Sequence, residues 1–153
     1  MEIIKSNMWV YNNKIINNIN DFESGTFGYI YRITNLINGK EYIGKKQLES
    51  KTNVKLGKKE KAALPTQRGR TPSKKLVVKE SNWKEYWGSC KPLLEDIKKL
   101  GPEKFKREIL MLCYNKKMLT YWEVSYQIKE DVLLRDTYNE TILSHYYKKD
   151  FIV

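Results

Sequence analysis

The sequence has little cysteine and almost no histidine. Its two cysteines, Cys90 and Cys113, lack metal-type spacing and are too few for a disulfide framework, so we expect reduced thiols in a cytosolic protein. The single histidine, His145, excludes a Cys2His2 zinc finger and any chemistry built on paired histidines. The function must therefore rest on other side chains.

Long apolar runs and acidic residues are also scarce. Nowhere do 18 apolar residues run together, and the N-terminus lacks an apolar signal segment, so we expect an unexported cytoplasmic protein with no membrane partner. Only 18 Asp and Glu oppose 29 Lys and Arg, which leaves a net charge of +11. Nucleic acid is the commonest polyanionic partner of such a surface, although charge alone indicates no activity.

What is present indicates one globular domain. The sequence is 41% hydrophobic and 12% aromatic, and 153 residues can bury a core. The hydrophobic patterns predict an α/β (α+β) fold, a small three-stranded antiparallel sheet flanked by helices. We expect strands over residues 29–34, 41–46 and 105–113, and helices over residues 90–100 and 121–130. A hairpin turning at Asn12 and Asn13 is expected within an N-terminal extension, residues 1–24, and residues 143–153 form a tail.

Residues 51–80 differ from the rest of the chain. They contain ten Lys or Arg against two Glu, with no apolar period of helix or strand. We predict a long, mobile basic insertion with a short helix near residues 58–64. A solvated linker is the alternative, but long loops within compact domains are usually functional. We therefore favour a nucleic-acid-contacting loop that orders on binding, with Arg68, Arg70, Lys75 and Lys79 as candidate contacts.

An Asn38-Gly39 pair predicts a tight hairpin between the first two strands. A two-residue turn there would place Tyr31 opposite Lys46, and the period of two would put Tyr31, Tyr42, Gly44 and Lys46 on one face. Gly44 is expected to leave a gap in which a phosphate could approach. The alternative is an ordinary cross-strand Tyr–Tyr contact that only stabilises the sheet.

The two motifs on this hairpin, Tyr29-Ile30-Tyr31 and Tyr42-Ile43-Gly44, resemble the signature of the GIY-YIG nuclease family. The resemblance covers roughly residues 25–142 and is closest to free-standing, phage-type (homing-like) GIY-YIG endonucleases. It implies a metal-dependent endonuclease that acts on DNA, most simply double-stranded DNA, in the host-cell cytoplasm if a phage encodes it. The alternative is a nucleic-acid-binding module of the same fold without catalysis. Whether the protein forms a homodimer is left open.

The resemblance also implies the metal site. Glu123 matches the family's helical glutamate, which binds one divalent ion, Mg²⁺ or Mn²⁺, and Asn139 matches an asparagine that completes the site. Each residue has a structural alternative. Thr120-x-x-Glu123 fits a capping box at the start of a helix, and Asn139 could be a turn residue.

The remaining roles follow from the same resemblance. Tyr31, or a water that it orients, would be the general base, and Tyr42 would position the nucleophile or the phosphate. Lys46, with a cation from the insertion, would neutralise charge on the phosphate, and Lys45 is a further candidate contact. The arginine that the family carries after the second strand has no clear match here, which favours the inactive module.

Overall fold

The chain forms two compact units in a computed structural model that describes residues 7–65, 69 and 72–152. The main unit comprises Met1–Leu48 and Asn82–Val153. The second unit, which we call the arm, comprises Glu49–Ser81. The two units are described separately below.

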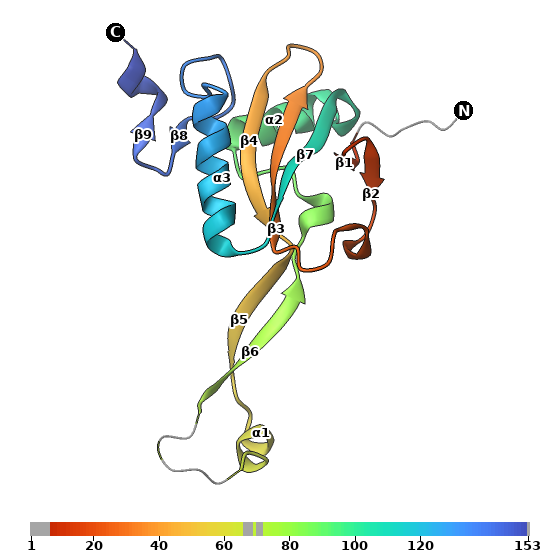
Figure 1. The fold of residues 1–153 in the computed structure, drawn as a ribbon, viewed down its shortest axis with the longest axis vertical. Coiled ribbons are helices and arrows are strands. Elements are labelled where there is room, and N and C mark those ends of the chain that lie inside the picture. Colours follow the sequence, from red (N-terminus) through yellow and green to blue (C-terminus); the bar gives the residue numbers. More distant parts are fainter. Residues whose placement is uncertain (1–6, 66–68, 70–71, 153) are drawn as a thin grey trace, which may run out of the picture. The chain divides into compact units, whose positions relative to one another are not determined.

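A mixed sheet of five strands, rather than the predicted three, organises the main unit (Figure 1). Its order is β2-β1-β7-β3-β4, and the predicted antiparallel strands are the last three of these. The extra two strands form the predicted N-terminal hairpin, whose β1 pairs in parallel with β7. Asn12 and Asn13 make its turn with φ of 48° and 64°. The strands are β1 Trp9–Tyr11, β2 Lys14–Ile16, β3 Gly28–Asn35, β4 Glu41–Gln47 and β7 Phe105–Cys113.

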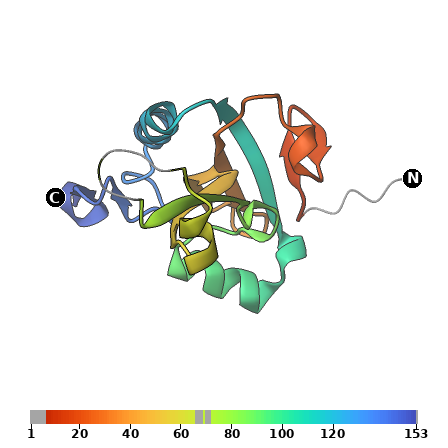
Figure 2. The same ribbon diagram turned by 90° about the horizontal axis from the view of Figure 1, so that it is seen from below.

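Two helices cover opposite faces of this sheet (Figures 1 and 2). Leu93 and Ile97 of α2 (Lys91–Leu100) pack in the cluster that contains Tyr31. Leu119 of α3 (Lys116–Lys129) packs in the other cluster with Ile30 and Ile43. The alternation of β3 therefore separates the tyrosine face from the α3 face. Short elements complete the unit: the 3-10 helices Ile19–Asp21, Trp83–Glu85, Pro102–Lys104 and Lys148–Phe151, and the strands β8 Thr141–Ile142 and β9 Tyr146–Tyr147.

Helix α3 begins five residues before the predicted start. Asn115 caps it by accepting a hydrogen bond from the Met118 amide, so Thr120 lies inside the helix. The prediction of a cap at Thr120 is therefore wrong, and the capping-box interpretation of Glu123 does not apply.

The β3–β4 hairpin differs from the predicted register by two residues. Tyr31 lies opposite Gly44, and Tyr29 lies opposite Lys46. The connection is longer than a two-residue turn. The Asn35 amide donates a hydrogen bond to the Lys40 carbonyl, and within the turn the Gly39 amide donates one to the Asn35 carbonyl. A shift of two preserves the faces, so Tyr31, Gly44 and Lys46 still share one face with Tyr42.

The arm is an antiparallel ribbon, so the prediction of an insertion without strands is wrong. It pairs β5 (Glu49–Lys55) with β6 (Lys74–Glu80), and the predicted short helix is α1 (Lys58–Ala62). Lys75 pairs with Glu60 at 2.8 Å, and Lys79 lies in β6. Arg68 and Arg70 lie outside the described residues.

A buried arginine of β7 ties the N-terminal hairpin segment to the chain before α2. Arg107 is 6% exposed and donates hydrogen bonds to the carbonyls of Asn7, Lys84 and Tyr86. Its guanidinium carbon lies 4.7 Å from the ring centre of Trp9 and 4.2 Å from that of Trp87. Burial lowers the pKa of Arg107 to about 10, so it stays charged at neutral pH.

We expect Arg107→Ala to lower the free energy of unfolding by about 3 kcal/mol, because three partly buried hydrogen bonds to carbonyls and the contacts of a buried cation with two indoles are lost. Urea unfolding followed by tryptophan fluorescence measures the change. Exposed Lys106→Ala on the same strand is the control and should cost less than about 0.5 kcal/mol. Equal losses for the two variants would contradict this role for Arg107.

Candidate active site

A cleft of about 420 Å³ opens at the β4 edge of the sheet. Its lining brings together parts that are far apart in the sequence: Tyr42 of β4, Ser89 and Lys91 at the start of α2, Glu123 of α3, and Asn139 and Glu140 of the following segment. Because β4 is an edge strand, the layers on both faces of the sheet reach this cleft. The structure thus places the predicted Tyr42, Glu123 and Asn139 together.

Tyr42 is the motif tyrosine that lines the cleft. Burial is the main cause that raises its pKa, to about 12, and a hydrogen bond with Ser89 opposes the rise. Its phenol is therefore protonated at neutral pH in the free protein. As a neutral phenol it can both donate and accept a hydrogen bond.

Tyr31 lies behind Tyr42 and is 1% exposed. The ring centres of the two tyrosines are 6.1 Å apart, and Tyr86 makes an edge contact with Tyr31 at 6.0 Å. Burial raises the pKa of Tyr31 well above its usual range. In this arrangement Tyr31 cannot supply a phenolate at neutral pH.

Two glycines make room for this pair of phenols. A Cβ atom on Gly44 would lie 2.5 Å from the Tyr31 hydroxyl, and one on Gly88 would lie 3.3 Å from the Tyr42 ring. The prediction of an open gap over Gly44 is therefore wrong, because the Tyr31 hydroxyl occupies that space. Gly88 also has φ of +88°, a conformation that side chains rarely adopt.

The two hairpin lysines point to different faces. The Lys46 ammonium donates to Asn82 Oδ1 at 2.7 Å and lies 4.0 Å from the ring centre of Tyr86. Lys45 instead reaches α3, with its ammonium 3.0 Å from Thr120 Oγ1 and 3.8 Å from Glu123 Oε1. The structure thus brings Lys45 to the candidate metal ligand, whereas Lys46 lies beside Asn82 and Tyr86.

Glu123 presents an acidic group that is mostly shielded from solvent. Its side chain is 18% exposed, and burial raises the pKa of its carboxyl while Lys45 lowers it. Lys45 interacts with this carboxylate through its backbone and its ammonium, and the two carboxylate oxygens have further lone pairs that a cation can use. The raised pKa is typical of functional carboxylates in clefts.

Asn139 fastens the edge of β4. Its side-chain amide accepts from the Ile43 amide at 3.0 Å and donates to the Ile43 carbonyl at 2.9 Å, as a neighbouring strand would. Gln127 of α3 donates to the same carbonyl at 3.0 Å. Asn139 therefore holds the edge of β4 rather than the turn that the structural alternative assumed, and its part in completing the metal site stays a prediction.

The donor set of the cleft fits one hard divalent ion. Glu123 and Glu140 supply carboxylate oxygens, and Mg²⁺ commonly takes one or two carboxylates and completes its shell with water and substrate phosphate. No group of three or more Cys, His, Asp and Glu able to hold a metal occurs within the described ranges. An open site with one or two carboxylates does not require such a group.

The sequence interpretation did not single out several polar residues of the cleft, among them Ser89, Lys91 and Glu140. Cys90 is the cap residue of α2 and makes no side-chain capping bond, whereas Ser89 forms a hydrogen bond with Tyr42. Gly88 before a helix was the available signal, because a glycine at positive φ allows the following residues to turn toward a neighbouring side chain. Nothing in the spacing of Lys91 or Glu140 indicated the cleft.

Comparisons with known proteins identify the family. The family model described as “Putative endonuclease segE, GIY-YIG domain” matches residues 9–151. The searches of curated proteins and of solved structures each found no significant match. Among the helices of the described residues, none is long and apolar enough to cross a membrane. The match spans nearly the whole chain and includes both tyrosine motifs and Glu123, so this protein belongs to the GIY-YIG family of endonucleases.

Proposed function

We propose that the protein is a metal-dependent DNA endonuclease whose active site is the cleft at the β4 edge. The observation that supports this most is the meeting of Tyr42 and Glu123 in one cleft, although they come from different elements and from opposite faces of the sheet. Packing of the core alone does not require the motif phenol of Tyr42 and the mostly buried carboxylate of Glu123 to line the same cleft.

Glu123 is the proposed ligand of one Mg²⁺ or Mn²⁺ ion, with Glu140 at the same cleft. When bound, such an ion stabilises negative charge on the phosphate and on the leaving oxygen. The protein's part is to present an ionised carboxylate within a shielded site. Lys45 favours the charged form of Glu123 and so opposes the burial that raises the pKa of its carboxyl.

Tyr42 is the proposed group that orients the attacking water and accepts its proton. It lines the cleft, and positive charge beside a phenol lowers its pKa. Lys45 and Lys91 are the nearby cations of the cleft region. We propose Tyr31 as a positioning residue, since its hydroxyl lies behind Tyr42 and is surrounded by protein.

Lys91 is the proposed cation for the charge that develops on the phosphate. It lies at the first position of α2, and both its side chain and the positive end of the helix favour an anion there. Lys46 is hydrogen-bonded to Asn82 and lies over the Tyr86 ring, so we propose that it helps to hold the tyrosines in position.

The arm is proposed to bind the DNA backbone. Residues 49–81 hold ten Lys or Arg against three Glu, which accounts for seven of the eleven net positive charges. An antiparallel ribbon is also a shape that fits a DNA groove. Lys75 and Lys79 of β6 remain proposed contacts, together with Arg68 and Arg70.

Replacing the arm by a short glycine linker is expected to weaken binding to duplex DNA by about 100-fold near physiological salt, because fewer phosphate contacts release fewer counterions. The ends of the ribbon are paired, Glu49 with Glu80, so a short linker can bridge the cut. Fluorescence anisotropy at several salt concentrations measures both affinity and salt slope. An unchanged slope would contradict a DNA-binding arm.

The second candidate is a DNA-binding module without catalysis. The absence of arginine from the described lining of the cleft favours it. The two candidates differ in product. Hydrolysis with a 5′-phosphate and a 3′-hydroxyl, as the family resemblance implies, gives nicks that DNA ligase seals directly. Sealable, metal-dependent nicks would support the nuclease, and retarded but uncut DNA would support the binding module.

A further inference from the structure

A second and larger cleft lies on the outer side of α3. Its volume is about 870 Å³, and it takes no part in the proposed chemistry. The wall is apolar and aromatic, formed by Tyr121, Val124, Ile128 and Leu143. Tyr121 is 66% exposed and Ile128 is 58% exposed, so these groups are not part of the core.

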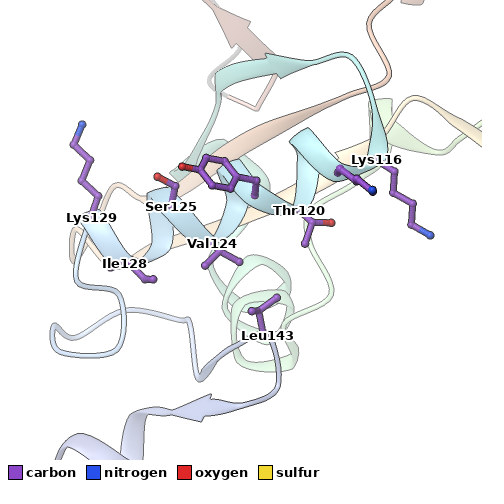
Figure 3. Close-up of a pocket in the computed structure, with 9 residues that line it drawn as sticks. Lys116, Thr120, Val124, Ser125, Ile128, Lys129 and Leu143 are labelled. Carbon is purple, nitrogen blue, oxygen red and sulfur yellow. The ribbon is translucent and has the colours of Figure 1, made fainter.

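Lysines stand at both ends of this wall. Lys116 and Lys117 line the cleft at the first turn of α3, and Lys129 lines it at the last residue (Figure 3). Lysine in a first turn opposes the helix dipole, and α3 has no acidic residue there to compensate. The two lysines therefore add to the positive end of the helix rather than stabilise it. No carboxylate lines the cleft within the described residues.

The α3 cleft adjoins the candidate active site. Leu143 lines both clefts, and Glu123 and Val124 are neighbours on α3 that line one cleft each. Figure 3 shows Val124 and Ile128 on the side of the helix toward Leu143. A ligand that leaves the active site past Leu143 therefore meets an aromatic ring between lysines.

Leu143 has an unusual backbone. It sits in the turn between β8 and β9 with φ of 56°, a conformation that is rare for a bulky side chain, and it is 57% exposed. Glycine would suit this turn better, and an exposed leucine contributes little to the core. Such local strain is common at functional sites.

We propose that the α3 cleft binds an unpaired segment of the DNA strand next to the scissile phosphate, with a base stacked on Tyr121. This inference rests on the proposed endonuclease function. Aromatic rings between cations are the usual platform for single-stranded nucleic acid, because every base has a face that can stack. Lys117 and Lys129 lie about 18 Å apart along the helix at 1.5 Å per residue, which is about five nucleotides at 3.4 Å each.

An acidic protein segment could also pair with the lysines of this cleft. A second copy of this chain is a poorer partner, because its lysines would repel the lysines of the cleft. DNA is favoured because the neighbouring cleft holds the same polymer in the proposed function. A DNA strand bound in the active-site cleft could continue into the α3 cleft, so no second ligand is needed.

The test is binding of a fluorescent single-stranded thymidine oligonucleotide in EDTA, measured by anisotropy. We expect Tyr121→Ala to weaken binding about fivefold or more, and Tyr121→Phe, which keeps the ring, to bind within about twofold of the natural chain. Lys117→Ala with Lys129→Ala should lower the salt slope by about one to two, whereas exposed Lys98→Ala with Lys99→Ala on α2 should not.

Unchanged affinity in Tyr121→Ala would overturn the proposal and leave an acidic protein as the occupant that fits. Equal loss in Tyr121→Ala and Tyr121→Phe would overturn stacking as its basis. Plasmid nicking by the natural chain is measured beside these. If the natural chain nicks plasmid but Tyr121→Ala binds the oligonucleotide as tightly as the natural chain does, only the α3 site is contradicted. If Tyr121→Ala weakens oligonucleotide binding but the natural chain does not nick plasmid, the α3 site is supported and the endonuclease function is contradicted.

Discussion

Replacing Glu123 by Gln is expected to reduce metal-dependent DNA cleavage by about 10³-fold or more, because loss of a metal ligand removes several kcal/mol of transition-state stabilisation. Binding to duplex DNA should remain, since the arm and the lysines are unchanged. Single-turnover nicking of a supercoiled plasmid at saturating protein separates the two effects.

The same variant should fold at least as stably as the natural chain. Burial raises the pKa of Glu123, so its charged form is disfavoured in the folded state, and the stability that the protonated form contributes is lost as pH rises. At neutral pH the neutral amide should raise the free energy of unfolding by roughly 0.5 kcal/mol. Loss of cleavage together with a large loss of stability would contradict a role in metal binding.

Tyr42→Phe is expected to lower the cleavage rate by 10² to 10⁴-fold, the usual contribution of a general base. Tyr31→Phe should lower it by about tenfold, because Tyr31 is 1% exposed and acts on the cleft only through Tyr42 and Tyr86. Both variants keep the ring, so the sheet and its aromatic contacts should be retained. The measurement is the single-turnover rate of each variant at one pH.

A larger loss of rate in Tyr31→Phe than in Tyr42→Phe would assign the general-base role to Tyr31. It would also require the cleft to open when DNA binds. The pH profile gives an independent check. The pKa of Tyr42 is about 12, so the phenolate fraction rises tenfold with each pH unit well below that value. The logarithm of the natural chain's rate should therefore rise with a slope of about one between pH 7 and 9, and this slope should disappear in Tyr42→Phe.

Most of the main sheet could be predicted because its strands carry local signals. Phe105–Cys113 agrees with its predicted bounds, since its second half is wholly apolar, as is typical of a central strand. The pairing of β1 with β7 could not be predicted, because a strand of three residues carries too little pattern to specify a distant partner. The arm escaped prediction for a related reason. Its strand residues are nearly all exposed, so no buried face imposed an alternation.

The sequence indicated which residues form the candidate site better than it indicated the contacts between them. The motifs indicated Tyr42 and Glu123, which meet in the cleft, and the shared face of Tyr31 and Tyr42 survived the change of register. The sequence could not show which of Lys45 and Lys46 reaches Glu123, because that depends on the position of α3. Nor could it show that Asn139 pairs with Ile43, since edge contacts between distant segments leave no local pattern.

The most direct test of the proposed function is incubation of the purified protein with supercoiled plasmid in Mg²⁺, in Mn²⁺ and in EDTA. We expect nicked circles to accumulate with either metal and to be absent in EDTA, because a single active site cuts one strand at a time. Retarded but intact plasmid under all three conditions would contradict the endonuclease and support a DNA-binding module of the same fold.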